Sequence, residues 1–243
     1  MRAPGELQIL LLEVVGLVAV VVLILRLGFR KPATGTALII SGGGPTRVVF
    51  ERTFVVPLLH TVEVIDISVR TITIELRGRE GISCRDHIRA DVRATFVVAI
   101  HRHPEDVFKA AASVGHARVG DPAALRELFA GKFVDGLRTV AKTLDFEELV
   151  AKRNDFKDEL IEVIGRDLGG FILDDVALES IEQTPISQLD PDDILDAEGI
   201  RKITERTVAE RLRTSELQMH MRKELAGADA ILNKSPPPEI PVD

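Results

Sequence analysis

The chain has 243 residues, of which 45% are hydrophobic and 28% charged, and its formal net charge is -7. This negative balance argues against a nucleic-acid partner, because no basic patch with interleaved aromatic residues is present to neutralise phosphates. Cys84 is the single cysteine, which excludes an internal disulfide and fits a reducing cytoplasm.

An apolar run occupies the N-terminal end of the chain, from Leu7 to Leu25. A helix of that length spans roughly 28 Å, close to the hydrocarbon thickness of a bilayer. We therefore predict a transmembrane anchor and its basic flank over residues 1–31. The predicted anchor residues are Leu7, Leu11, Val14, Leu17, Val21, Leu25, Arg26, Arg30 and Lys31.

Two alternatives fit this apolar run less well. A cleaved secretory signal needs a basic start and a small-residue cleavage site, whereas Arg2 is offset by Glu6 and Arg26 follows the apolar core directly. A buried soluble helix needs a polar face, which residues 14–25 lack. The positive-inside rule then places the chain after the anchor on the cytoplasmic side, since the basic residues follow the span.

Short β-rich runs come next and are separated by turn-forming segments, residues 41–45 and Pro57. These runs cover residues 37–40, 47–50, 62–65 and 72–76. The clearest strand extends from Ile88 to Ile100, where apolar and polar side chains mostly alternate, so that one face is buried and the other solvated. A half-solvated sheet of this type is typical of antiparallel pairing.

Helical patterns follow the sheet. Pro104 opens a helix over residues 105–114, and Asp121 and Pro122 supply the N-cap and first position of a second one. An apolar stripe recurs along that second helix, and its members are Leu125, Phe129, Phe133, Leu137, Val140 and Leu144. A third helix runs through Phe156 to Leu168 and stops at Gly169 and Gly170.

The pattern then reverts to a strand over residues 171–181, so the globular part is predicted to be α+β. Beyond it, Asp196 is expected to cap a long charged helix that reaches about Ala230. The proline cluster that begins after Ser235 predicts a disordered tail.

Four segments in this order resemble the flotillins, most closely those of bacterial inner membranes. They are residues 57–67, 91–98, 132–138 and, most strongly, Leu-Asp-Pro-Asp-Asp-Ile-Leu-Asp-Ala-Glu-Gly-Ile at 189–200. The resemblance covers most of residues 33–205. Its specificity comes from the four segments occurring together in this order. It implies an SPFH (band 7) domain that is attached to the inner (plasma) membrane by a single span and assembles into large oligomers that organise membrane microdomains.

The resemblance divides the chain into four parts. They are the anchor (1–31), an SPFH domain with an antiparallel sheet and packed helices (32–185), a linker with a charged helix (186–232), and a proline-rich tail (233–243). Flotillins usually carry a long coiled-coil tail, whereas the helix here is short and its apolar positions fit a heptad poorly. A naturally short relative, a truncated fragment and assembly through the SPFH domain remain open.

Clusters that suggest chemistry are better explained structurally. His101 and His103 lack a third metal ligand, and acidic residues 190–196 lack the spacing of a calcium loop. The glycine-rich residues 41–44 lack the lysine of a phosphate loop and predict a hairpin turn. Cys84 has no activating base beside it in the sequence. We therefore predict no catalytic, cofactor-binding or metal-binding residue.

Two sets of residues are candidates for membrane contact and self-association. Arg70, Arg77 and Arg79 are candidates for contact with anionic lipid headgroups, the alternative being an ordinary solvated sheet face. Self-association is predicted to involve Phe129, Phe133 and Leu137, unless they belong to the core, together with residues of the last helix. Those residues are Asp196, Ile200 and Ile203.

The predicted function is a non-enzymatic membrane scaffold. Its expected partners are further copies of the chain, membrane lipids and other membrane proteins, and no nucleic acid. The alternative is a regulatory subunit that binds a membrane protease or transporter, as stomatin-like and prohibitin-like relatives suggest.

Overall fold

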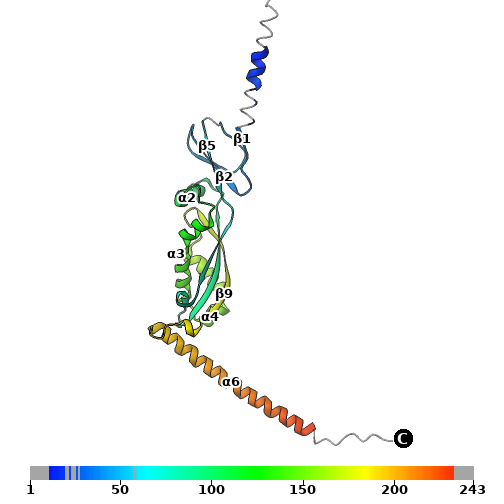
Figure 1. The fold of residues 1–243 in the computed structure, drawn as a ribbon, viewed down its shortest axis with the longest axis vertical. Coiled ribbons are helices and arrows are strands. Elements are labelled where there is room, and N and C mark those ends of the chain that lie inside the picture. Colours follow the sequence, from blue (N-terminus) through cyan, green and yellow to red (C-terminus); the bar gives the residue numbers. More distant parts are fainter. Residues whose placement is uncertain (1–10, 20–21, 23–25, 27, 57–58, 233–243) are drawn as a thin grey trace, which may run out of the picture.

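The computed structural model describes residues 11–19, 22, 26, 28–56 and 59–232. The chain is elongated, with the helical residues 11–19 at one end, a small β-region next, an α+β body in the middle, and one long helix leaving the far end (Figure 1). The predicted tail and part of the predicted anchor, including Leu7, Val21 and Leu25, lie outside the described residues.

The N-terminal β-region, residues 28–56 and 59–67, contains five short strands. They are β1 (Phe29–Arg30), β2 (Thr36–Ser41), β3 (Arg47–Val49), β4 (Thr53–Phe54) and β5 (Thr61–Asp66). β2 pairs with both β3 and β5, and β1 pairs with β4, all antiparallel. The turn from β2 to β3 is the predicted hairpin, in which Gly42 and Gly43 take φ values of 96° and 68° that favour glycine.

A second antiparallel sheet forms the centre of the body. Its strands are β6 (Arg70–Leu76), β7 (Ile82–Ser83), β8 (Arg89–Ile100) and β9 (Phe171–Gln183). β9 pairs along one edge of β8, while β6 and β7 share the other. Alternate residues of β8, from Ala90 to Ile100, are buried, and those between them are more exposed, which confirms the predicted half-solvated strand.

Helices cover one face of this sheet (Figure 1). They are α2 (Pro104–Val114), α3 (Pro122–Ala141), α4 (Phe146–Ala151) and α5 (Arg153–Ile164), and two short 3-10 turns, η1 (Gly78–Glu80) and η2 (Ile186–Gln188), connect other elements. Asp121 caps α3 as predicted, because its side chain accepts a hydrogen bond from the Ala123 N–H at 3.0 Å. The predicted end of α5 at Gly169 is wrong. The helix stops at Ile164 because Gly165 takes a φ of 80°.

The aromatic stripe of α3 is part of the core. The Phe133 ring stacks on Phe96 of β8 with centroids 4.1 Å apart, and Phe129 meets Phe171 of β9 edge-on at 5.3 Å. Leu137 is also fully buried. The condition that these residues lie outside the core is therefore not met, because the sheet and α5 already cover Phe129, Phe133 and Leu137.

The last helix, α6 (Ile194–Leu232), begins three residues earlier than predicted. Asp193 provides the cap, since its Oδ1 accepts hydrogen bonds from the N–H groups of Leu195 at 2.9 Å and Asp196 at 3.1 Å. Asp196 lies inside the first turn and is buried, so its predicted role as N-cap is corrected.

Candidate membrane and assembly surfaces

The helical residues 11–19 carry exposed apolar side chains. Leu12 is 79% exposed and Leu17 is 67% exposed, and Leu11 and Val14 are exposed in the same way. Within the part of the chain that the structure describes, no helix is both long enough and apolar enough to cross a bilayer. The transmembrane anchor stays a prediction, because several of its residues are not among those described.

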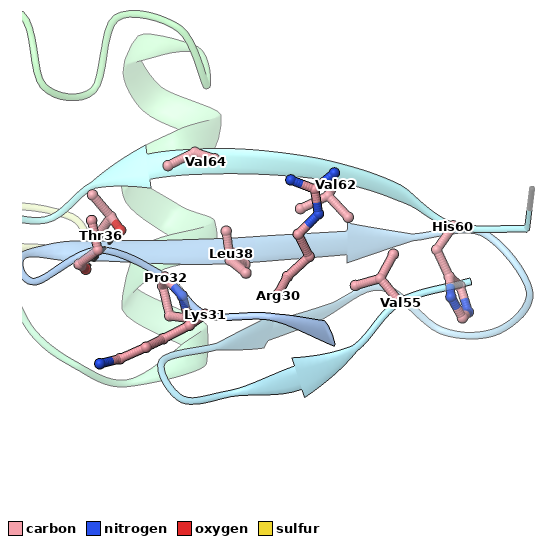
Figure 2. Close-up of a pocket in the computed structure, with 10 residues that line it drawn as sticks. Arg30, Lys31, Pro32, Thr36, Leu38, Val55, His60, Val62 and Val64 are labelled. Carbon is pink, nitrogen blue, oxygen red and sulfur yellow. Dashed lines mark hydrogen bonds between the residues drawn. The ribbon is translucent and has the colours of Figure 1, made fainter. Parts of the chain in front are cut away.

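The basic flank leads directly into the N-terminal β-region. Arg26 is exposed, Arg30 ends β1 opposite Thr53 of β4, and Lys31 follows it. Next to this flank lies a cavity of about 490 Å³ between the β1 segment and the paired strands β2 and β5 (Figure 2). We call it the flank pocket. Its lining residues are Arg30, Lys31, Pro32, Ala33, Thr36, Leu38, Val55, His60, Val62 and Val64.

The three arginines predicted to face lipid do not form one patch. Arg70 starts β6 and pairs with Asp66, while Arg77 pairs with Glu75 and Arg79 lies 3.4 Å from Asp190. The register of β6 along β8 separates Arg70, at the end next to the N-terminal β-region, from the other two at the end next to α6. Lipid contact through these arginines stays a prediction.

Asp66 marks the connection between the N-terminal β-region and the body. Burial raises the pKa of its carboxyl group, but hydrogen bonds from Ser68 and the charge of Arg70 outweigh that effect and hold the pKa below its ordinary value. The connection is therefore braced by an ionised carboxylate at neutral pH.

A buried ion pair holds the start of α6 against the body. The Arg89 guanidinium donates to Asp196 Oδ1 from Nη2 at 2.6 Å and from Nε at 3.0 Å. The same arginine donates to the backbone carbonyls of Arg79 and Gly81, and the other Asp196 oxygen accepts the Asp190 N–H at 3.1 Å. The Asp196 side chain is only 6% exposed, so this carboxylate depends on its partners.

Close packing completes this α6 joint, by which we mean residues 189–206 and their partners on the body. A Cβ added to Gly199 would lie 2.5 Å from the His87 carbonyl oxygen, so only glycine allows this approach. Ile203 is buried against Ile88 and Leu189, with Ile200 packed beside them. Asp196, Ile200 and Ile203 thus fasten α6 to the body, and their role in self-association stays a prediction.

Polar contacts from the next turns reinforce the α6 joint. Lys202 Nζ donates to the Asp86 carbonyl at 2.8 Å, and Arg206 donates to Glu147 of α4 at 2.8 Å. Arg85 contacts Asp145 and Glu148 at the start of α4, and its hydrogen bond lowers the pKa of Asp145. Beyond residue 203, every described side chain of α6 is exposed.

The exposed part of α6 carries apolar residues that the body does not cover. They are Val208, Leu212, Leu217, Met219, Met221 and Leu225. A groove of about 550 Å³ lies where the helix passes α4 and the end of β9, lined by Phe146, Gln183 and Thr207 among others. These features make α6 the candidate assembly surface.

The residues considered for chemistry are not arranged for it. Burial raises the pKa of the Cys84 thiol to about 12, with the charges of Asp86 and Asp145 adding to the effect. The rings of His101 and His103 lie 6.2 Å apart. Among the described residues there is no group of three or more His, Cys, Asp or Glu side chains that could hold a metal ion.

Comparison with known proteins places this architecture in a family. Residues 19–226 match the model of the family described as "SPFH domain / Band 7 family". The chain belongs to this family. Its fold is therefore that of an SPFH domain, with antiparallel sheets and packed helices, as the resemblance predicted.

Two curated relatives agree with the predicted resemblance. The Flotillin family inner membrane protein YqiK of Escherichia coli (strain K12) is 30% identical over 195 residues, covering 78% of this chain and 35% of that protein. The Flotillin family inner membrane protein sll1021 of Synechocystis sp. (strain ATCC 27184 / PCC 6803 / Kazusa) is 29% identical over 155 residues, covering 62% and 22% respectively. This SPFH chain spans about a third or less of their lengths.

Sequence reasoning missed two features of this SPFH domain. Arg89 looked like one more solvated residue of an alternating strand, and nothing in its spacing pointed to Asp196, which is 107 residues away. The flank pocket is built from residues between 30 and 38, from Val55, and from residues between 60 and 64, which only β pairing brings together.

Proposed function

We propose that this SPFH chain is a membrane-anchored, self-associating scaffold that organises membrane microdomains and clusters other membrane proteins or lipids. One observation carries the proposal. Apolar side chains are exposed on helical segments at the two opposite ends of the molecule, residues 11–19 and the part of α6 beyond Ile203, while most apolar residues of the body are packed in its core. Such exposed apolar surfaces are typical of membrane and protein contacts.

The two ends have different roles in this proposal. The N-terminal segment attaches the chain to the inner membrane, where the names of both relatives place those proteins, and the body lies on the cytoplasmic side. The exposed part of α6 then binds the same helix of neighbouring copies. Once several copies are joined, each further membrane contact is intramolecular, so weak contacts add up to durable attachment.

The scaffold is proposed to be non-enzymatic. The buried Cys84 thiol, with its raised pKa, has almost no thiolate at neutral pH and is not an effective nucleophile. This function requires no catalytic group, because attachment and lateral contact are made by surfaces rather than by a reaction.

The test measures the mass of the full chain in a mild detergent by light scattering, with negative-stain imaging of the same fraction. We expect a large, uniform assembly. The triple variant Leu212→Gln, Leu217→Gln, Met221→Gln should reduce it to small species without changing its helix content, because it removes the exposed apolar residues of α6.

A matched triple variant on the same helix, Glu216→Gln, Arg222→Gln, Lys223→Gln, should keep the large assembly, since it leaves the apolar residues in place. A wild-type chain that is monomeric or dimeric would contradict the scaffold. That result would favour the regulatory subunit, which predicts a defined stoichiometry with one membrane protease or transporter.

A further inference from the structure

The flank pocket combines an apolar floor with a cationic rim. Leu38, Val55 and Val62 form the floor, and Val64, which is 63% exposed, extends it to the surface. Figure 2 shows the Arg30 side chain reaching from the β1 segment across the cavity toward Val62 of β5, with His60 at the far end of the strands. Among the described residues that line the cavity, none is acidic.

The cations of this pocket differ from Arg70 in their surroundings. Arg70 pairs with Asp66 at the next strand boundary. Within the described residues, by contrast, neither Arg30 nor Lys31 has a carboxylate within 4.0 Å. Two cations without acidic partners lie beside an apolar wall on which Val62 is partly exposed and Val64 is exposed. This combination favours a ligand that is both anionic and partly apolar.

The histidine of the pocket is held in one orientation. Its Nδ1 accepts the Val56 N–H at 3.0 Å, so the proton of the neutral ring resides on Nε2. The ring therefore offers only a donor to a ligand, as Arg30 and Lys31 do. A cavity of about 490 Å³ lies within the range of small-molecule sites and holds a phosphoglycerol group with the first carbons of its chains.

We propose that the flank pocket binds the headgroup of an anionic phospholipid. The phosphate accepts hydrogen bonds from the Arg30 guanidinium, and Lys31 adds charge at the rim. The glycerol and the first acyl carbons cover Val62 and Val64. The proposal rests on the membrane attachment proposed above, because Arg30 lies only a few residues after the predicted span and hence at headgroup level.

The test counts lipids retained by the full chain in mild detergent, by native mass spectrometry, after incubation with dioleoyl phosphatidylglycerol or dioleoyl phosphatidylcholine. Wild type should retain the anionic lipid about tenfold better than the zwitterionic one. Arg30→Gln removes the phosphate donor, and Val64→Glu places a negative charge on the exposed wall. Each should lower retention of phosphatidylglycerol about tenfold.

Two matched variants control for general charge effects. Arg52→Gln and Val69→Glu change exposed residues of the same region that do not line the pocket, and both should retain lipid as wild type does. Equal retention of both lipids by wild type, or unchanged retention in Val64→Glu, would overturn the proposal. Displacement of the lipid by excess inorganic phosphate would assign the pocket to free phosphate and would also overturn it.

A separate measurement distinguishes failure of the pocket from failure of membrane attachment. Native membranes that contain the full chain are washed with alkaline carbonate, which releases proteins that are not integral. Release of the chain would contradict the membrane attachment on which both proposals depend. Retention in the membrane without selective lipid binding would overturn the flank-pocket proposal alone.

Discussion

Helices α3 and α6 are both long, with 20 and 39 residues, yet they use their apolar residues in opposite ways. The stripe of α3 is buried against the sheet and α5, whereas α6 is buried only at its start and exposed beyond Ile203. The stability of α3 is therefore explained within the chain. The exposed apolar residues of α6 beyond Ile203 are not covered by the fold of a single copy, which is why we propose that they contact neighbouring copies.

The α6 joint lies between the buried and the exposed parts of α6. Buried residues and polar contacts fasten about the first three turns to the body, and the remainder projects away from it (Figure 1). A helix fixed at one end can link the body to neighbouring copies without contributing to the core of the body. Three experiments test this difference between α3 and α6.

The largest effect is expected in the core of α3. Phe133→Ala removes a fully buried ring that stacks on Phe96, which should lower the free energy of unfolding by about 3–5 kcal/mol. Leu217→Ala, on the exposed part of α6, should change it by less than about 0.5 kcal/mol. Chemical denaturation of the full chain in detergent measures both, and similar losses for the two variants would refute the division between the helices.

The next effect is expected at the α6 joint. Asp196→Ala leaves the Arg89 guanidinium without its carboxylate in a largely buried position, and should cost about 3 kcal/mol. Hydrogen exchange should also rise in the first turns of α6. Asp192→Ala, an exposed acid whose side chain makes no hydrogen bond within the described residues, is the control and should behave as wild type.

The smallest effect is expected from acid at the start of α4. The hydrogen bond from Arg85 lowers the pKa of Asp145 in the folded state, so this pair contributes stability above the unfolded-state pKa of about 4. That contribution is lost as the pH falls through the folded-state pKa. Thermal unfolding midpoints should therefore decline below about pH 4 somewhat more steeply for wild type than for Arg85→Gln.

Arg118→Gln is the matched control for this acid effect, because it removes an exposed ion pair with Glu127 away from the α6 joint. Its pH profile should follow wild type. A profile of Arg85→Gln that also coincides with wild type would show that the Arg85 contact adds no stability to the joint.

Much of the fold was predictable because it depends on local patterns. Alternation along residues 88–100 indicates a strand with one buried face, and Asp121 followed by Pro122 indicates a helix start, and both are present. The end of α5 was misjudged because two glycine signals compete. Gly165 acts first, although Gly169 and Gly170 also have left-handed backbones.

The candidate sites were less predictable because their parts are far apart in the chain. An apolar stripe has the same spacing whether it packs in the core or forms an exposed binding surface. The pattern alone therefore left the role of Phe133 open. The pairing of Arg89 with Asp196 and the cavity beside Arg30 arise from contacts between distant segments, for which no local signal exists.

The sequence by itself determined the apolar N-terminal run, the α+β order, the hairpin turn and the family resemblance, since each depends on neighbouring residues or on an ordered set of motifs. Only the tertiary structure decided that the α3 stripe is core, that Asp196 joins α6 to the body, and that Arg30 borders a pocket. The physical reason is that burial and pairing depend on which distant surfaces meet. Local spacing does not contain that information.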